Sequence, residues 1–267
     1  SKENAYAAAI VVELAAVVRR MQGLDMTKDE IAAALGRTTR HVDNLFVLAA
    51  AARAETLRVA VTADTSICCY PEEREFAPGG CPRIKMKGTE NVILLDFDAA
   101  PLRGKPVSRA VLHMRETESN LMVRRVGVST VAVPWVEGSG GSYDARGGAC
   151  FLRPASGAEW AGPGSDFLGA VWGRGGTFWA QAVAARGADG WWTVPLDGRF
   201  LEACAAGLSF GLAVSDDNGQ TMNIARDLMP KANFSNNFFF AREQSGAAPW
   251  LEAEMDPEPG RRAAPAP

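Results

Sequence analysis

Hydrophobic and polar positions follow two different periods along the 267-residue chain. From about residue 5 to residue 54, alanine, leucine and valine recur at helical spacing, and the first proline is Pro71. This spacing predicts three helices, the first of them over 5–22. From residue 56 the period changes to two, and the alternation of residues 57–64 is typical of a β-strand. The pattern therefore divides the chain into a helical segment, 1–54, and a β-rich segment, 55–255.

Short strands and turns fill the β-rich segment. Residues 91–98 and 107–115 carry β-branched and aromatic side chains at close to period-two spacing, and a loop with two prolines and a glycine separates them. A third strand is predicted over 121–128, and further strands follow as far as Met255. This succession of short strands and turns predicts a mainly β fold, which we interpret as a jelly-roll-type β-sandwich. Residues 256–267 contain four prolines and predict a flexible tail.

Two local predictions concern the last third of the β-rich segment. Residues 177–183 and 191–196 are expected to form a hairpin around the turn at 187–190. Residues 199–206 are expected to form a short helix. The residues of this helix that should point inward are Phe200, Leu201 and Cys204.

The helical segment contains a helix-turn-helix-like pattern at 27–50. Thr27 and Glu30 have the spacing of a capping box, which starts a helix, and Gly36 can supply the left-handed conformation that ends it. The small side chain of Ala32 lets a following helix approach. Apolar contacts of the motif would come from Ile31, Ala32, Leu35, Val42 and Leu45. The side chains that would face a DNA groove are Arg37, Arg40, His41 and Asn44.

The charge of this segment argues against a nucleic-acid partner. Residues 1–55 hold seven basic and seven acidic side chains, so they imply no strong attraction for phosphate. A helical element for packing or self-association explains the same pattern.

An export signal is a second interpretation of these residues. Residues 45–52 form an unbroken apolar run, and Ala52-Arg53-Ala54 has the small-x-small form of a signal-peptidase site, with Arg37 and Arg40 as a positive flank. Export signals lie at the N-terminus, whereas this run begins 44 residues into the chain. The sequence leaves both interpretations open. No apolar run reaches the roughly 20 residues that span a bilayer, so no membrane span is expected.

Composition sets further limits. With 47% apolar residues the chain can bury a sizeable core, and a net charge of -3 excludes a chain built as a whole to bind nucleic acid or an anionic membrane. The spacing of the five cysteines is not that of a zinc site. One or two disulfides are plausible in an exported chain, and buried small hydrophobes are the alternative. The cysteines are Cys68, Cys69, Cys81, Cys150 and Cys204.

Catalytic motifs are missing from the sequence, and we expect a protein that is not an enzyme. There is no nucleophile elbow, P-loop or zinc-binding histidine pair. A Ser-His-Asp site in the β-rich segment would depend on His113, which is better explained as a packed strand residue. Glu137 and Asp144 could form the carboxylate pair of a glycosidase, so a glycan-active enzyme remains an alternative.

The loop at 215–220 has the densest cluster of oxygen ligands. Calcium takes six to eight oxygens, so this loop is a candidate calcium site, to which Asp64 could contribute from the first strand. An Asp/Asn-Gly turn held by its own side chains is the alternative, and it is the favoured explanation of the loop. No other cofactor is expected. The loop's candidate ligand-binding residues are Asp216, Asp217, Asn218 and Gln220.

Aromatic residues carry the remaining functional signal. A sugar stacks its C–H face on an exposed aromatic ring, and its hydroxyls require polar side chains nearby. Tyr143 and Asp144, in the glycine-rich loop 138–148, are candidates, and so are Trp160 and Trp191, in or beside other predicted loops. Packing against these loops is the alternative role. The tryptophans predicted to belong to the core are Trp135, Trp172, Trp179, Trp192 and Trp250.

An ordered set of short motifs runs through residues 57–255. A strand ending in LLDFD is followed by a proline-containing loop, a SRAVLHM strand and Trp135-Val136-Glu137. Ala63-Asp64-Thr65 lies upstream, and further pieces lie downstream at 192–197, 207–214, 240–243 and 249–251. The set resembles the DNRLRE domain, a β-sandwich of secreted bacterial and archaeal proteins. Arg242 and Glu243 resemble its Arg-Glu motif, although Ala241 stands where that motif has a serine.

The resemblance implies export and a non-catalytic role. We therefore expect an extracellular or cell-surface module that binds a polysaccharide or another surface component. One alternative is a structural protein that assembles into a filament or lattice through its helices or edge strands. Another is a DNA-binding helix-turn-helix sensor.

Overall fold

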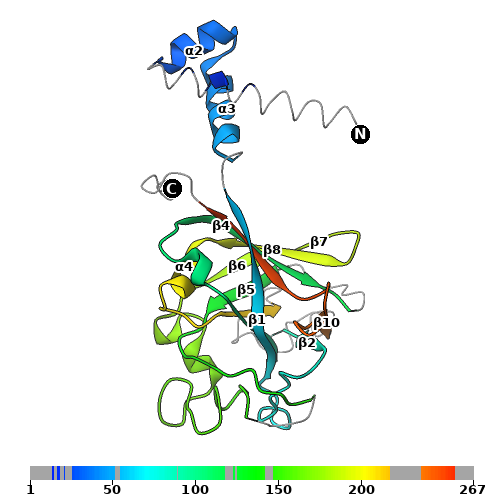
Figure 1. The fold of residues 1–267 in the computed structure, drawn as a ribbon. Helices are drawn as coiled ribbons and strands as arrows, with labels where there is room; N and C mark the ends of the chain where they lie inside the picture. Colours follow the sequence, from blue (N-terminus) through cyan, green and yellow to red (C-terminus); the bar gives the residue numbers. More distant parts are fainter. Residues whose placement is uncertain are drawn as a thin grey trace, which may run out of the picture. The chain divides into compact units, whose positions relative to one another are not determined.

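The structure is a computed structural model of the 267-residue chain (Figure 1). It describes residues 14, 17, 18, 21, 26–51, 55–88, 90–117, 123, 125–141, 147–216 and 236–255. The chain divides into two compact units: a β unit, Thr56–Met255, and a helical unit, which combines Ser1–Glu55 with Asp256–Pro267.

In the helical unit, α2 (Lys28–Leu35) and α3 (Thr39–Ala51) are separated by a three-residue turn. The predicted capping box is confirmed. The Thr27 N–H donates to Glu30 Oε2 at 2.7 Å, and the Thr27 hydroxyl accepts from the Glu30 N–H at 3.3 Å. Gly36 ends α2 in the left-handed conformation with φ of 60°, as its position predicts.

A small apolar core joins these helices. The helix predicted over 5–22 lies mostly outside the described residues, but positions 14, 17, 18 and 21 are helical. Apolar side chains from three stretches of sequence therefore meet. The buried members of this core are Val18, Ile31, Ala32, Val42 and Leu45.

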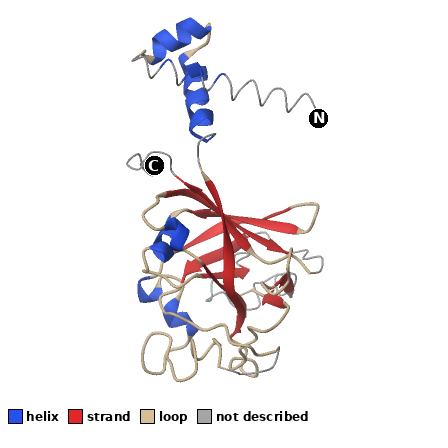
Figure 2. Cartoon of the chain, viewed as in Figure 1, coloured by secondary structure: helices blue, strands red, loops and turns tan. Residues whose placement is uncertain are grey.

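The β unit is made of short strands with a few helical turns, as Figure 2 shows. Its strands are β1 (Thr56–Cys68), β2 (Arg83–Met86), β3 (Asn91–Phe97), β4 (Val107–Arg115), β5 (Arg125–Thr130), β6 (Trp179–Val183), β7 (Ala185–Arg186), β8 (Trp191–Asp197), β9 (Leu212–Asp216), β10 (Asn237–Phe240) and β11 (Trp250–Met255). Its helices are α4 (Arg199–Ala205) and the 3₁₀ turns η1 (Ala100–Leu102), η2 (Phe167–Ala170) and η3 (Arg174–Gly176). The short helix predicted over 199–206 is thus confirmed as α4, which buries Phe200 and Leu201.

Nine strands form one antiparallel sheet, and β10 pairs with β2 as a separate ribbon. The order in the sheet is β6-β5-β9-β3-β1-β11-β4-β8-β7. Strand β1 pairs with two neighbours: its first five residues pair with β11, and the part from Val61 onward pairs with β3, with an irregularity between Val61 and Ala63. Strands β6 and β7 end the order on opposite sides, yet only Ala184 separates them in sequence. The sheet is therefore nearly closed and barrel-like (Figure 1).

The prediction of a mainly β fold is confirmed, but this strand order does not show the jelly-roll-type sandwich. Strand β1 pairs with both β3 and β11, and the continuous stretch 179–186 pairs with both β5 and β8. Hydrogen bonding therefore links the two halves of the strand order at both places. The strand predicted over 121–128 is shifted: β5 begins at Arg125 and continues to Thr130.

Two apolar cores pack on opposite faces of the sheet. The inner core collects inward-facing side chains such as Leu95 of β3, Leu112 of β4 and Phe200 of α4. The outer core covers β3 and β9, where Leu94 packs in a cluster with Trp160 and other residues from the long segment between β5 and β6. That segment shields the outer face of one half of the sheet, and it ends at β6.

Candidate binding site

The candidate site begins at an exposed tryptophan on β6. Trp179 has 49% of its surface exposed, and none of the other six tryptophans, all of which are described, is as open. Phe178 and Ala182 pack against the inner core, so Trp179, Gln181 and Val183 face outward. The prediction that Trp179 belongs to the core is wrong, because the alternation of β6 turns it towards solvent.

Trp160, a predicted ligand-binding residue, is instead fully buried. Its Nε1–H donates to the Cys150 carbonyl at 2.9 Å, and its ring meets Phe167 edge-on with the centroids 5.1 Å apart. It lies in a loop, as predicted, but this loop is folded into the outer core. Its indole is therefore closed to a ligand. Trp191, the other predicted tryptophan, starts β8 and is half-buried.

A glycine-rich loop passes beside Trp179. Trp172 has a positive φ of 56°, which is unusual for a bulky residue, and Gly173, Gly175 and Gly176 have φ of 84°, 64° and 82°. A Cβ added at Gly173 would lie 3.6 Å from both Cδ1 and Nε1 of Trp179. The backbone of the loop therefore runs along the pyrrole edge of the indole.

Hydrogen bonds fix the path of this loop. The Trp172 N–H donates to Ser129 Oγ of β5 at 2.9 Å. The Thr177 hydroxyl accepts from the Gly173 N–H at 3.0 Å and donates to the Arg174 carbonyl at 2.6 Å. A loop that is already ordered loses less conformational entropy when a ligand binds.

Polar groups continue this surface along β5 and β6. Arg125 lies opposite Val183, and its Nη1–H donates to Gln181 Oε1 at 3.2 Å. Gly127, opposite Gln181, adds no side chain between them. Arg174 is exposed in the loop, next to Gly173. We call the surface made by Arg125, Arg174, Trp179, Gln181 and Val183 the β6 platform.

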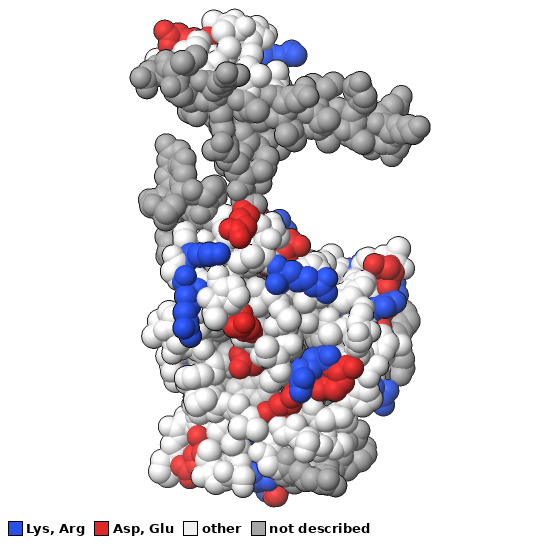
Figure 3. Space-filling model, in the orientation of Figure 1, with Lys and Arg blue, Asp and Glu red and all other residues white. Residues whose placement is uncertain are grey.

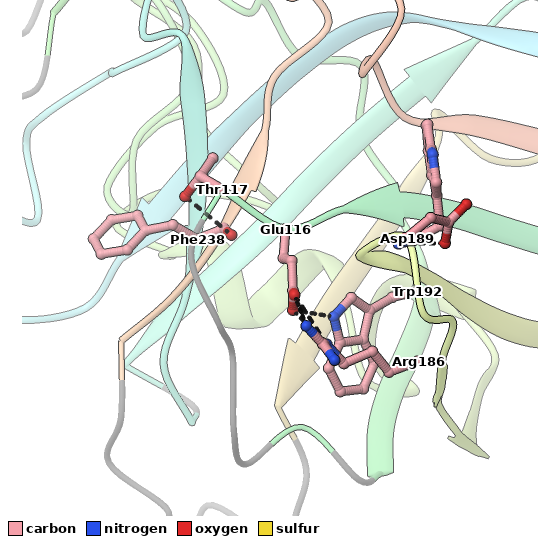
Figure 4. Close-up of polar contacts among 7 residues, drawn as sticks. Glu116, Thr117, Arg186, Asp189, Trp192 and Phe238 are labelled. Atoms are coloured by element: carbon pink, nitrogen blue, oxygen red, sulfur yellow. Dashed lines mark hydrogen bonds and ion pairs between the residues drawn. The ribbon is translucent and has the colours of Figure 1, made fainter.

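A buried carboxylate anchors the other end of the same stretch of chain. The Glu116 side chain is 7% exposed and accepts from Arg186 Nε at 2.9 and 3.0 Å, and also from Arg186 Nη2. The Trp192 Nε1–H donates to the same carboxylate at 2.8 Å. Figure 4 shows the guanidinium and the indole converging on Glu116. Because β7 continues β6, this contact helps to hold the platform strand in place.

The oxygen-rich loop is only partly within the described residues. Asp216 ends β9 with 1% exposure and accepts a hydrogen bond from Asn237 Nδ2 at 3.3 Å. Asp216 is therefore buried and hydrogen-bonded, and its role as a ligand-binding residue stays a prediction. In the described part of the chain, no three His, Cys, Asp or Glu side chains are grouped to hold a metal ion. The predicted residues outside the described part are Tyr143, Asp144, Asp217, Asn218 and Gln220.

Asp64 belongs to a different cluster, which links three distant segments. Its Oδ2 accepts from the Arg242 N–H at 2.7 Å, and its own N–H donates to Glu137 Oε1 at 2.6 Å. The Arg242 guanidinium binds both carboxylate oxygens of Glu137 and lies 3.3 Å from that of Glu243. Burial raises the pKa of Asp64 to about 7, chiefly through desolvation of the carboxylate.

This cluster has a structural role. Asp64 is 1% exposed, and Glu137, predicted to pair with Asp144, is engaged by Arg242. The backbone of Glu137 is also tightly enclosed, since a Cβ at Gly79 or Gly148 would lie 2.0 or 2.5 Å from its carbonyl oxygen. The cluster therefore ties the start of the 137–141 segment to β1 and to the chain before β11.

Four of the five cysteines are buried or half-buried. Cys68, Cys81 and Cys150 are buried, and Cys204 is half-buried. Burial raises the pKa of Cys68 to about 12 and that of Cys204 to about 11. Thiols with such pKa values stay protonated and unreactive at neutral pH.

The helical unit exposes the side chains that its motif predicts to face a groove. Ile31, Ala32, Val42 and Leu45 are buried. The exposed residues of the turn and of α3 include Arg37, Arg40, His41 and Asn44. One pair of charges is already engaged, since Lys28 Nζ contacts Asp43 Oδ1 at 2.5 Å.

Comparisons of the sequence with known families and curated proteins identify no relative. No protein-family model matches the chain, and a search of curated proteins gives no match. The resemblance to the DNRLRE domain therefore depends on its short motifs alone. Among the described helices, none is long and apolar enough to cross a membrane.

Proposed function

We propose that the β unit is a non-catalytic module that binds carbohydrate through the β6 platform, in a protein of the cell surface or extracellular space. The observation that carries the proposal is the 49% exposed indole of Trp179 beside an ordered glycine-rich loop. A sugar can stack its apolar C–H face on this indole. Gln181 and Arg125 then supply hydrogen-bonding groups for its hydroxyls.

The charged residues favour binding over catalysis. A glycosidase needs two carboxyl groups that reach the substrate. Asp64 and Glu137 are near one another, but one is buried and the other is held by Arg242. The motifs shared with the DNRLRE domain support export, and with it the proposal that the fold is a variant of that jelly-roll-type family.

A glycan-array screen of the full chain tests this function. We expect binding to at least one glycan, retention of that binding in Trp191→Ala, and its loss in Trp179→Ala. Trp191 is the matched control because it is a half-buried tryptophan on another strand. The absence of binding to every glycan, with the wild-type protein folded, would contradict the proposal.

Double-stranded DNA is a second candidate ligand, for the helical unit. The observation that favours it is the left-handed Gly36 between two short helices, with Arg40 and Asn44 exposed on the second. This arrangement resembles a helix-turn-helix, a motif whose second helix enters the major groove.

A mobility-shift assay at low salt with mixed-sequence DNA tests this candidate. Binding should weaken as salt rises, because phosphate contacts release counterions, and Arg40→Ala should abolish the shift. Arg103→Ala, which replaces an exposed arginine of the β unit, is the control. A missing shift at low salt removes DNA from consideration.

A further inference from the structure

Strand β1 loses its partner β11 part of the way along its length. Strand β11 pairs with residues 56–60 of β1, whereas β3 pairs with β1 as far as Cys68. Beyond residue 60, the Asp64 N–H donates to Glu137 Oε1 at 2.6 Å. A carboxylate from a distant segment, and not β11, therefore satisfies this part of β1.

Three segments meet at this point. The Arg242 guanidinium donates to both carboxylate oxygens of Glu137, and the Arg242 N–H donates to Asp64 Oδ2 at 2.7 Å. The three residues thus form a closed ring of contacts, which we call the Asp64 cluster. It ties β1 to the segment 137–141 and to the chain 241–249, which leads from β10 into β11.

The Asp64 carboxyl is enclosed but only partly satisfied. The residue is 1% exposed, Oδ2 accepts the one N–H of Arg242, and Oδ1 is buried without a hydrogen-bond partner. A carboxylate spreads its negative charge over both oxygens, so ionisation puts charge on an oxygen that is closed to solvent and has no donor. The neutral carboxyl avoids most of this cost.

The charges around Asp64 also oppose its ionisation. The pKa of Asp64 is raised to about 7 by desolvation first, and then by the negative charges of Glu243 and Glu137. The N–H and the guanidinium of Arg242 act in the opposite direction. That guanidinium is shared, because it binds Glu137 and lies 3.3 Å from the Glu243 carboxylate. On the side of β3 the residue opposite Asp64 is Leu95, which carries no charge.

More distant charges have a smaller part in this balance. On the face of the β unit that Figure 3 draws, acidic and basic side chains are interspersed, so that face has no broad field of one sign. Salt screens such exposed charges, whereas it screens buried contacts much less. In the described part of the chain, these acids do not belong to a group that could hold a metal ion, so the titration concerns a proton alone.

We propose that the Asp64 cluster is a pH-operated switch, closed while the Asp64 carboxyl is neutral and opened locally as that carboxyl ionises. Opening separates Asp64 from Arg242 and Glu137, releases a proton to solvent and exposes the amides that the cluster protects. The rest of the sheet keeps its pairing. This inference concerns a conformational device and does not depend on the β6 platform.

The pKa values of the two states give the direction of the switch. In the open state Asp64 regains its ordinary pKa of 3.8, whereas in the closed state its pKa is about 7. The ratio of open to closed cluster should therefore rise about tenfold per pH unit between about pH 4 and pH 7, and level off above pH 7.

Hydrogen exchange of the full chain tests the switch. The probes are the amides of Asp64 and Arg242, and each rate is divided by the intrinsic rate of the unfolded peptide at the same pH. We expect the protection of both amides to fall about a hundredfold from pH 5 to pH 8 in the wild type. In Asp64→Asn, which keeps an acceptor but has no carboxyl to ionise, protection should stay constant.

Low concentrations of urea distinguish local opening from unfolding of the whole β unit. Local opening exposes little surface, so exchange at Arg242 should be nearly independent of urea. Exchange at Leu112, in the inner core, should accelerate as urea is added. Equal urea dependence at both residues would show that the cluster opens only when the β unit unfolds, and would overturn the switch.

Two further variants assign the effect to the cluster. Asp96→Asn is the matched control, because it removes another carboxyl whose pKa is raised by burial, on β3 and outside the cluster; the hundredfold change should persist. Glu137→Gln removes the anion that binds Arg242 and should lower the protection of the Arg242 amide at both pH values. Thermal melting checks that each variant is folded, and the wild-type measurements test the switch even where a variant fails to fold.

The contradicting outcomes concern the switch alone. Protection in the wild type that stays constant between pH 5 and pH 8 would overturn it. The same fall in protection in Asp64→Asn as in the wild type would overturn it as well, because the titrating group would then lie elsewhere. Neither result bears on carbohydrate binding at the β6 platform.

Discussion

Trp250 and His113 lie directly opposite one another on β11 and β4, and their rings stack with centroids 3.7 Å apart and planes 5° from parallel. The Arg58 guanidinium covers the other face of the same indole, with its Cζ 4.3 Å from the ring centroid. Both faces of Trp250 are therefore occupied by the protein. Trp179 differs because nearly half of its surface is open.

This stack predicts a structural effect without a binding effect. Burial lowers the pKa of His113, so the ring that meets Trp250 is neutral at pH 7. Trp250→Ala removes the stack and the contact with Arg58, and we expect the free energy of unfolding to fall by about 2 kcal/mol. Urea unfolding measures the loss. Glycan affinity should be unchanged, and a variant as stable as wild type would argue against the stack.

The buried carboxyl of Asp64 makes stability depend on pH. Its pKa is raised in the folded state, so it favours folding most below its ordinary value of 3.8, and this contribution is lost as pH rises through about 7. Between pH 5 and pH 8 the wild type should lose about 2–3 kcal/mol relative to Asp64→Asn, which has no carboxyl to ionise. Urea titrations of both proteins at the two pH values measure the difference. Parallel pH profiles would contradict it.

Two glycines offer a matched test of the packing around Glu137. A Cβ at Gly79 would lie 2.0 Å from the Glu137 carbonyl oxygen, whereas one at Gly162 would meet nothing within 4 Å. We expect Gly79→Ala to cost about 3 kcal/mol or more and Gly162→Ala to change stability by under about 1 kcal/mol. Chemical unfolding of the two variants measures this. Equal stabilities of the two variants would mean that the Glu137 backbone is not tightly enclosed.

The anchor at Glu116 predicts a contrast between two ion pairs. Glu116→Ala leaves the Trp192 Nε1–H and the Arg186 guanidinium without their acceptor, so the urea midpoint should drop clearly. Arg199→Ala breaks the exposed pair with Asp197 and should leave the midpoint nearly unchanged. The same shift in both variants would contradict a special role for the Glu116 contact.

Local features of the fold could be predicted from the sequence. The capping box at Thr27 and Glu30 depends on residues three apart, and α4 depends on a single helical turn pattern; both are present. The β-rich character also follows from alternation within each strand. These signals are short-range, so one sequence contains all the information that they need.

The candidate site could not be predicted, because its exposure depends on long-range packing. Trp160 lies in a loop and Trp179 in a strand, which suggested the reverse of their actual exposure. The deciding factor is that the segment between β5 and β6 folds over β3 and β9, buries Trp160 and stops short of Trp179. Contacts across 178 residues, such as that of Asp64 with Arg242, are equally invisible in local patterns.

The most direct test of carbohydrate binding at the β6 platform is a calorimetric titration of the best array ligand into three proteins: wild type, Trp179→Ala and Trp191→Ala. Binding by a single module is expected to be weak, with a Kd on the order of 1 mM, or about 4 kcal/mol. At this affinity the loss of one stacked ring should abolish detectable heat. We therefore predict no binding by Trp179→Ala and unchanged binding by Trp191→Ala. Unchanged binding by Trp179→Ala would contradict the central claim.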